Sequence, residues 1–455
     1  MSKNNIDMRH GPLVGKIIMF AIPLACSSIL QQLFNAADIA VAGHFAGSEA
    51  LAAVGANGAL INLIINLFVG LSVGANVVIS TYIGKEDKKA VSKAVHTTII
   101  LALISGVILV FIGEFIAPEI LKLMGTPPEI LDLATTYLKI YFLGMPFIIL
   151  YNYEASILRS KGDTTRPLIV LSIAGVINVI LNLILVIVFH LSVAGVAIGT
   201  LVSNMISSMV LLYFLIREEE PFKVRLSNFR LDGKIVRKIF SIGVPSGVQG
   251  MVFSFSNVMI QTAMNTLGTT PVAATTAALN LEYASFFILS SFSQAAVSFI
   301  GQNYGAGLKE RCIKVVRTCW GLALVFTMAY SLLIILFAEP LTHLFTNDSA
   351  VVELAVIRIK VILSVAFLNM TIEVLSGVMR GLGKSFIPAM IAVVGICGTR
   401  LVWLYTAFRA VPTYRMLINV YPVSWIITAV GIILAYLVVR KKYFQVKKDT
   451  NTKSV

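Results

Sequence analysis

The stretch Ala75–Gly84, ANVVISTYIG, returns 221 residues later as Ala296–Gly305, AVSFIGQNYG. Pro23, in FAIP, is followed at nearly the same interval by Pro245, in IGVP. Self-similarity at one interval indicates an internal repeat, because unrelated segments do not keep a common register. We therefore expect two homologous halves.

The longest polar interruption lies between these halves. Arg217–Lys234 reads REEEPFKVRLSNFRLDGK and separates long apolar stretches. Arg159 and Arg380 also lie 221 residues apart, one on each side of it, and each is followed eight residues later by a proline. We therefore predict an N-terminal lobe at 1–216, a linker at 217–234 and a C-terminal lobe at 235–455.

The composition places both lobes in a membrane. Hydrophobic residues make up 57% of the chain and charged residues 13%, whereas soluble proteins carry roughly 25% charged residues. Crossing a hydrocarbon core of about 30 Å takes roughly 20 helical residues. The apolar stretches of that length lie at 17–43, 50–83, 92–117, 133–158, 166–189, 193–216, 236–266, 272–303, 316–337, 354–379, 387–408 and 418–440. We therefore expect an all-α membrane protein with twelve transmembrane helices, six in each lobe.

The basic residues indicate the orientation in the membrane. Lys and Arg accumulate in alternate loops, such as 85–89 and 159–166, whereas the loops at 43–49 and 267–271 contain none. Cytoplasmic loops carry such an excess, so we expect both termini in the cytoplasm. The same clustering accounts for the formal net charge of +14 without a nucleic-acid partner. The span at 17–43 is too long for a cleavable signal peptide and is expected to remain as the first helix.

Enzyme motifs are absent from the sequence. The four cysteines form no CxxC pair and the five histidines are scattered, so neither a disulfide framework nor a zinc site is indicated. No HExxH, GxSxG or Walker-type loop occurs. We therefore expect no catalytic site, no organic cofactor and no ATP hydrolysis.

Several motifs together resemble the multidrug and toxic compound extrusion (MATE) family. They include LMGTPPEILDLATTYLKIYFLGMPF from Leu123, LRSKGDTTRP from Leu158, VAGVAIGT ending at Thr200, IGQNYGAG from Ile300 and MRGLGKSFIP from Met379. The resemblance runs nearly end to end. It implies two six-helix lobes arranged in a V, alternating access coupled to Na⁺ or H⁺, and substrates that are commonly organic cations.

Asp38 lies in the first span, within ADIAVAGHFAG, where a buried carboxylate costs at least about 2.5 kcal/mol on insertion scales. Gln31, Asn35 and Asp38 are spaced by four and three residues and so share a helix face, which we expect to point into the lobe interior. We predict that Asp38 binds the coupling cation, with Gln31 and Asn35 near the substrate. The alternative is a structural carboxylate satisfied by neighbouring amides.

Three polar residues in the fifth and sixth spans complete this predicted site. Asn178 and Asn182 are four residues apart and share a helix face, and Thr200 opens the polar side of the next span. Carboxylate, amide and hydroxyl oxygens are the hard ligands that an alkali cation accepts, and the same groups can stabilise a protonated Asp38. Interhelical hydrogen bonding, worth about 0.6 kcal/mol, is the alternative role of the asparagines. Many MATE relatives have an acid where this chain has Asn182, so the predicted site has one formal charge, which argues against loading Na⁺ and H⁺ together.

The second half does not repeat the aspartate, because Asp38 aligns with Ile260. Its candidate substrate-binding acids are Glu282 and Glu373, and Arg400 lies about mid-depth in the eleventh span. Glu373 and Arg400 have comparable depths, roughly 10 and 18 Å from the intervening turn at about 1.5 Å per residue. We therefore expect Glu373 to pair with Arg400 as a structural counter-ion, and Glu282 to be the freer acid that attracts a cation. The alternative is that Glu373 contacts the substrate instead.

The remaining candidates are structural or gating residues. Glu154, five residues before Arg159, is expected to be a gate or a surface ion-pair residue. Pro23 and Pro245 are expected to mark bends. Glycines spaced by four predict close helix approach; they are Gly70 and Gly74, Gly301 and Gly305, and Gly377 and Gly381.

Taken with the resemblance, these features predict a Na⁺- or H⁺-coupled antiporter that exports small organic cations. Six helices in each half would relate the repeats by an axis along the membrane normal, with a site near mid-membrane. We expect a functional monomer in a bacterial cell membrane. The alternatives are a flippase for lipid-linked precursors and, from other classes, a membrane enzyme or a receptor.

Overall fold

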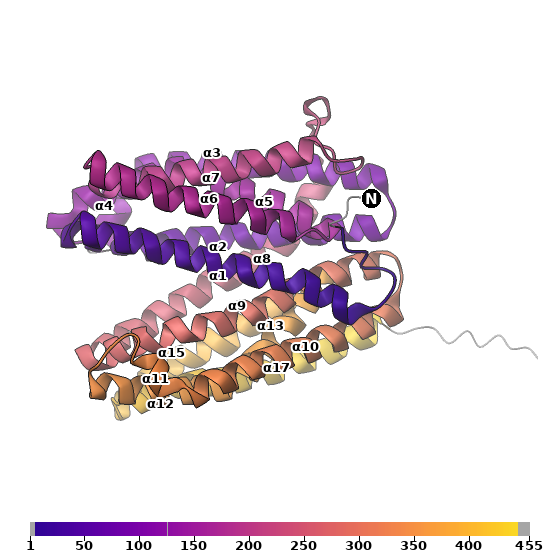
Figure 1. The fold of residues 1–455 in the computed structure, drawn as a ribbon. Coiled ribbons are helices and arrows are strands. Elements are labelled where there is room, and N and C mark those ends of the chain that lie inside the picture. Colours follow the sequence, from indigo (N-terminus) through magenta and orange to yellow (C-terminus); the bar gives the residue numbers. More distant parts are fainter. Residues whose placement is uncertain (1–4, 125, 445–455) are drawn as a thin grey trace, which may run out of the picture. The chain divides into compact units, whose positions relative to one another are not determined.

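The computed structural model describes residues 5–124 and 126–444, and these form helices and turns with no strand among them (Figure 1). Ten helices are long and apolar enough to cross a membrane, or eleven spans if one bent pair counts as a single span. The all-α prediction is therefore confirmed. The chain ends that we expect in the cytoplasm, 1–4 and 445–455, lie outside the described residues.

The helices of the first half follow the predicted spans. They are α1 (Leu13–Phe45), α2 (Ser48–Gly84), α3 (Lys88–Leu123), α4 (Pro128–Leu143), α5 (Met145–Lys161), α6 (Thr165–Leu183) with the π-helical turn η1 (Ile184–Val188), and α7 (Ser192–Ile216). The linker contains the short helix η2 (Leu226–Asn228).

The second half has the same order with more interruptions. Its helices are α8 (Gly233–Asn265), α9 (Thr269–Gly305), α10 (Lys309–Leu336), α11 (Ala338–Thr342), α12 (Ser349–Ser364), α13 (Ala366–Gly381), α14 (Phe386–Ala392), η3 (Val393–Gly398), α15 (Thr399–Trp403), η4 (Leu404–Phe408), α16 (Tyr414–Ile418) and α17 (Val420–Tyr443). Each predicted span therefore coincides with a helix or an interrupted series of helices.

The interruptions repeat with the sequence interval. Helices α4 and α5 meet at Gly144 with a bend of 44°. Val365, 221 residues later, separates α12 from α13. By contrast, α1 and α8 continue through Pro23 and Pro245, so neither expected bend breaks its helix.

The helices form two compact units. Unit 1 comprises Met1–Ile6, Met19–Ile79 and Asp87–Thr262, and unit 2 comprises Asp7–Ile18, Ser80–Glu86 and Ala263–Val455. Helix α8 thus clusters mainly with unit 1, although the repeat assigns it to the second half. The predicted lobe boundaries stay a prediction.

Glycines explain why α8 packs in unit 1. A Cβ atom on Gly70 of α2 would lie 2.2 Å from the backbone nitrogen of Gly247, and one on Gly74 would lie 2.4 Å from the carbonyl oxygen of Ile239. No side chain fits at such distances, so the two backbones touch through glycine. The predicted close approach at this pair is confirmed.

In unit 2, glycines likewise allow close contact between α9 and α13. A Cβ atom on Gly377 would lie 2.6 Å from the carbonyl oxygen of Ser293, and one on Gly381 would lie 2.8 Å from that of Val297. Small residues allow such contacts in membrane helices. They hold α13 against α9 and fix the depth of Glu373.

Candidate functional site

Asp38 is the centre of a polar site inside unit 1. The residue is 9% exposed, and its Oδ1 accepts a hydrogen bond from Asn182 Nδ2 at 2.5 Å. Thr200 Oγ1 lies 3.3 Å from Oδ2 and also donates to the carbonyl of Val196 at 3.0 Å. Because a hydroxyl has one proton, Thr200 serves one of these acceptors at a time. The structure therefore brings together the carboxylate and side chains predicted from the sequence.

The amide of Asn178 completes the set of donors. With its nitrogen toward Asp38, Nδ2 donates to Oδ1 at 2.8 Å and its oxygen accepts from the backbone nitrogen of Thr200 at 3.3 Å. Asn178 and Asn182 are one turn apart on α6 and both are buried. An ionised carboxylate surrounded by neutral donors retains its formal charge, which a cation or proton can neutralise.

Two glycines that the sequence analysis did not identify shape this site. A Cβ atom on Gly199 of α7 would lie 2.0 Å from Asn182 Oδ1, so the asparagine occupies space that only glycine leaves. A Cβ atom on Gly175 of α6 would lie 1.8 Å from the ring of Phe34 on α1. These contacts set the approach of α1 and α7 to α6. For Gly199, the sequence signal is the small-residue motif VAGVAIGT that ends at Thr200.

The rings of Tyr137 and Tyr141 on α4 stack with centroids 5.9 Å apart. Gln31 and Asn35 are exposed, in contrast to Asp38. The predicted positions of Gln31 and Asn35 near the substrate stay predictions, because their exposure alone does not test them.

Glu282 of unit 2, whose side chain is 11% exposed, has a partner although it was expected to be the freer acid. Glu282 on α9 forms a bidentate ion pair with Arg358 on α12, with Nε–Oε1 and Nη2–Oε2 distances of 2.8 and 2.9 Å. The Arg358 side chain is 1% exposed. The expectation that Glu282 is the freer acid is wrong, because Arg358 already neutralises it.

Glu373 and Arg400 also differ from expectation. A carboxylate oxygen of Glu373 lies 3.5 Å from Arg380 Nη2 on the same helix. The guanidinium of Arg400, 1% exposed, lies over the ring of Tyr421 with its carbon 4.5 Å from the centroid. The ion pair of Glu373 is therefore formed within α13, since Arg380 is two turns away on the same face, and the expected pair with Arg400 is wrong.

Glu154 has no role in an ion pair. It lies in α5 with 0% exposure, and neither carboxylate oxygen has a hydrogen-bond partner among residues 5–124 and 126–444. The expectation of a surface ion pair is wrong, because the helix turns this side chain into the packed interior of unit 1.

A network of charged side chains lies at the C-terminal end of α5. Glu218 accepts hydrogen bonds from Lys161 at 2.5 Å and from Arg166 at 2.6 Å, and Arg166 also pairs with Asp163 at 2.6 Å. Burial by itself raises the pKa of Glu218, but the hydrogen bonds from Lys161 and Arg166 outweigh it and hold that pKa below its usual value. Lys161, Asp163 and Arg166 belong to the LRSKGDTTRP motif, which therefore ties α5, α6 and the end of α7 together.

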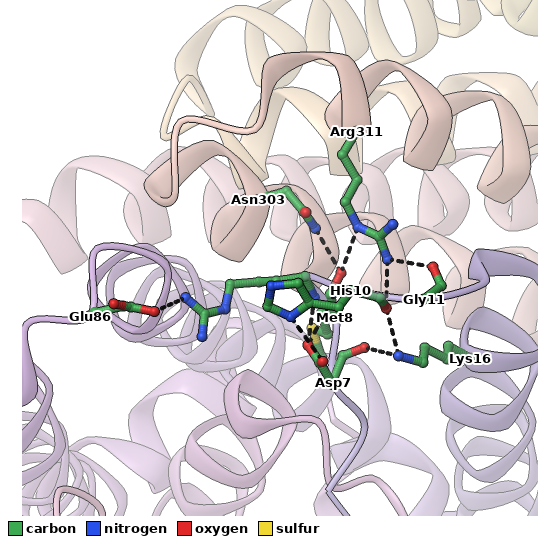
Figure 2. Close-up of polar contacts among 9 residues, drawn as sticks. Asp7, Met8, His10, Gly11, Lys16, Glu86, Asn303 and Arg311 are labelled. Carbon is green, nitrogen blue, oxygen red and sulfur yellow. Dashed lines mark hydrogen bonds and ion pairs between the residues drawn. The ribbon is translucent and has the colours of Figure 1, made fainter.

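Residues that precede α1 are held by unit 2 (Figure 2). The carbonyl of buried Met8 accepts hydrogen bonds from Asn303 Nδ2 at 3.0 Å and from Arg311 Nε at 3.3 Å. Arg311 Nη2 donates to the carbonyls of His10 and Gly11 at 2.9 and 3.0 Å. We call these residues the N-terminal clasp. It binds backbone only, so it fixes a segment and offers no ligand site.

The sequence of this chain is similar to those of known multidrug resistance and export proteins. The MatE family model matches residues 23–184 and 245–406, once in each half. The chain is 29% identical over 405 residues to "Probable multidrug resistance protein NorM" of Thermotoga maritima, covering 88% of this chain and 87% of that protein. It is 23% identical over 398 residues to "Multidrug export protein MepA" of Staphylococcus saprophyticus, covering 84% and 88%.

A solved structure shows the same fold. It is described as the outward-facing conformation of a multidrug resistance MATE family transporter, and it matches with a TM-score of 0.90 at 22% identity, covering 97% of this chain and 99% of that one. The names of these relatives describe multidrug resistance, multidrug export and a transporter. Since one family model matches both halves and most of the chain, the protein belongs to the MatE family of multidrug efflux transporters.

Proposed function

We propose that this transporter exports small organic compounds, cations among them, in exchange for Na⁺ or H⁺ bound at Asp38. The observation that carries the proposal is a buried carboxylate held by Asn178, Asn182 and Thr200, with no charged group among these partners. An uncompensated charge inside a membrane protein is costly and marks ion and proton sites. Asp38 therefore supplies one charge per cycle for coupling.

The amides allow either coupling ion. The nitrogen of Asn182 faces Asp38, and the hydrogen-bond pattern favours the amide orientation of Asn178 that also turns its nitrogen toward Asp38; both suit an ionised carboxylate. A protonated Asp38 needs one of these amides to present its oxygen as an acceptor, and Na⁺ needs oxygen ligands from several of them. Asn178 and Asn182 lie on α6 and Asp38 lies on α1, so rotation of either amide when an ion binds changes a contact between these two helices.

We further propose alternating access of a monomer in the bacterial plasma membrane, with both chain ends in the cytoplasm. Among the acids of unit 2, Glu373 is the better candidate for attracting a cationic substrate, because its side chain is 22% exposed and its ion pair with Arg380 is longer, at 3.5 Å, than the bidentate pair of Glu282 with Arg358 at 2.8 and 2.9 Å. The flippase alternative is not favoured, since Arg358 is committed to Glu282 and Arg400 is buried over Tyr421.

Transport in proteoliposomes tests this proposal. Uptake of a fluorescent organic cation is followed while Na⁺ and pH gradients are imposed separately, with wild type, Asp38→Asn and the exposed control Asp132→Asn. We expect one gradient to drive wild type and Asp132→Asn, and neither to drive Asp38→Asn although it still exchanges substrate without a gradient. Gradient-driven transport by Asp38→Asn would exclude Asp38 as the coupling site.

A further inference from the structure

Glu154 is a further buried acid of unit 1, and unlike Asp38 it receives no hydrogen bond from the described residues. Asp38 accepts hydrogen bonds from side chains of α6 and α7, whereas neither oxygen of Glu154 has a partner within the described residues. Both side chains are inaccessible or nearly so, at 9% and 0% exposure. The two carboxyl groups therefore need different charge states in the same conformation.

The titratable groups on neighbouring elements are occupied elsewhere. From α3, His96 has its Nδ1 2.7 Å from the carbonyl of Ser92, and its Nε2 accepts from the backbone nitrogen of Arg225 at 3.0 Å. This pattern makes His96 neutral, with its proton on Nδ1. From α5 itself, Arg159 donates to the carbonyls of Ala155 and Asn152.

The other packed helices add no cation near Glu154. Lys139 of α4 lies 3.7 Å from Glu114, and Arg166 of α6 pairs with Asp163 and Glu218. Helix α7 carries Tyr213, which is exposed, and α2 contributes the amide of Asn76, which donates to the carbonyl of Ser156. Tyr151 of α5 donates its hydroxyl to the carbonyl of Pro167.

A carboxylate in this position cannot be ionised at a reasonable cost. An isolated buried ion costs several kcal/mol or more, and the usual outcome is that the group takes up a proton. A permanently neutral position needs no acid, because an amide or an apolar residue fills the same space. An acid that is neutral here and can ionise in other surroundings has the property required of a proton carrier.

We propose that Glu154 is a second proton-binding site of the transport cycle, occupied in this conformation and emptied when movement of α5 gives its carboxylate donors or water. The proposal rests on cation-coupled export and adds a proton to that cycle. Glu154 lies seven residues before the end of α5, about 10 Å at 1.5 Å per residue. We expect that end at the cytoplasm, so the proton exchanges with the cytoplasmic side.

Infrared spectroscopy tests the charge state without requiring transport. The carbonyl stretching band of a protonated carboxylic acid is recorded at pH 7 for purified full-length wild type, Glu154→Gln, Asp38→Asn and Glu310→Gln, an exposed acid that serves as control. We expect Glu154→Gln to lose a band that Asp38→Asn and Glu310→Gln retain. Loss of no band in Glu154→Gln would mean that Glu154 is ionised and would overturn the proposal.

A second measurement separates a proton carrier from a permanently neutral acid. Adding an organic cation that wild type transports should lower this band and release protons to a pH-sensitive dye, and both signals should be lost in Glu154→Gln. Glu154→Asp keeps an acid, so it should keep the signals and serves if Glu154→Gln does not fold. A band insensitive to substrate would overturn the proposal. Absence of any gradient-driven transport in wild type would instead overturn cation coupling, whatever the band shows.

Discussion

Asp38 in unit 1 and Glu282 in unit 2 are acids within the helices of homologous halves, the first buried and the second with a side chain that is 11% exposed, yet they have different partners. Asp38 is held by two amides and a hydroxyl, whereas Glu282 is held by both nitrogens of a guanidinium fork. Neutral donors stabilise a carboxylate without cancelling its charge, and an arginine cancels it. At these two positions, therefore, unit 1 keeps a carboxylate that no cationic side chain neutralises, whereas unit 2 pairs its carboxylate with an arginine.

The repeat shows where this difference arises. The residue 221 positions after Thr200 is Tyr421. Its ring lies beneath two cations, with the guanidinium carbons of Arg400 and Arg358 at 4.5 and 5.0 Å from the centroid. A hydroxyl that donates to a carboxylate in unit 1 thus corresponds to an aromatic face that receives arginines in unit 2. The same position of the repeat therefore contacts a carboxylate in unit 1 and two guanidinium groups in unit 2.

The largest effect is expected from breaking the pair in unit 2. Arg358→Met leaves Glu282 buried without a counter-ion and should lower the free energy of unfolding by about 3–5 kcal/mol. Glu282→Gln should be similarly harmful, because Arg358 is then uncompensated. Thermal unfolding in detergent measures both.

The double variant Arg358→Met/Glu282→Leu sharpens this test. Removing both charges should restore most of the stability, because well-packed apolar residues replace buried ion pairs at little cost. Lys360→Met, at an exposed site on the same helix, is the control. Additive losses in the double variant would show that the two side chains do not act as a pair.

The next effect concerns the neutral donors of unit 1. Gly199→Ala places a methyl group 2.0 Å from the present position of Asn182 Oδ1 and must displace the amide. We expect a loss of about 2 kcal/mol, typical of overpacking, and weaker stabilisation of the protein by the coupling cation. Thermal unfolding with and without Na⁺, at several pH values, measures both.

Gly55→Ala is the matched control for this variant. It lies in α2 of unit 1, where an added Cβ meets no atom within 4 Å. Alanine also has the higher helix propensity, so this variant should be as stable as wild type or slightly more stable. Normal cation binding by Gly199→Ala would show that the position of Asn182 is not needed.

These contacts show what the sequence could and could not predict. The helices and the grouping of Asp38, Asn178, Asn182 and Thr200 follow from hydropathy, helical spacing and the family resemblance. Arg358 could not be assigned in this way, because it lies in none of the motifs that carry the family resemblance and nothing in its spacing joins it to Glu282 on another helix.

Two other features also required three-dimensional information. Gly199 was missed because a residue without a side chain has no polar signal, and its importance lies in the space it leaves for Asn182. Glu154 was placed at the surface because five residues separate it from Arg159, and spacing alone does not show which helix face is packed. Pairing and packing across helices are therefore the parts that the sequence does not determine directly.

A smaller loss of stability is expected at Glu218, the acid of unit 1 that is paired with the basic side chains of Lys161 and Arg166. Glu218 has a pKa lowered by Lys161 and Arg166, so its ionisation stabilises the folded protein above its unfolded pKa of 4.5. This contribution is lost as pH falls through the lower folded pKa. Glu218→Gln should therefore reduce the free energy of unfolding by about 1.5 kcal/mol at pH 7, and the difference from wild type should shrink below pH 4.5. A difference that stays constant from pH 7 to pH 4 would exclude this ion network as its source.

The smallest effect is expected at the N-terminal clasp, where an arginine of unit 2 holds backbone and no acid. Arg311→Ala removes donors to the carbonyls of Met8, His10 and Gly11, and such loss at a chain terminus causes local opening, not global unfolding. Hydrogen exchange should become faster in a peptide that covers residues 5–16, while the unfolding midpoint stays unchanged.

Glu86→Gln supplies the comparison for the clasp. Arg9 donates to Glu86 at 2.7 Å, and this bond lowers the pKa of Glu86, but the acid is 73% exposed and water can replace its partner. Exposed pairs of this kind contribute little, so exchange in the same peptide should hardly change. The hydrogen bonds that Arg311 donates to backbone carbonyls, not the surface ion pair, would then hold the segment. Equal acceleration by Glu86→Gln and Arg311→Ala would reverse that assignment, because it would make the exposed charge as important as the hydrogen bonds from the arginine fork.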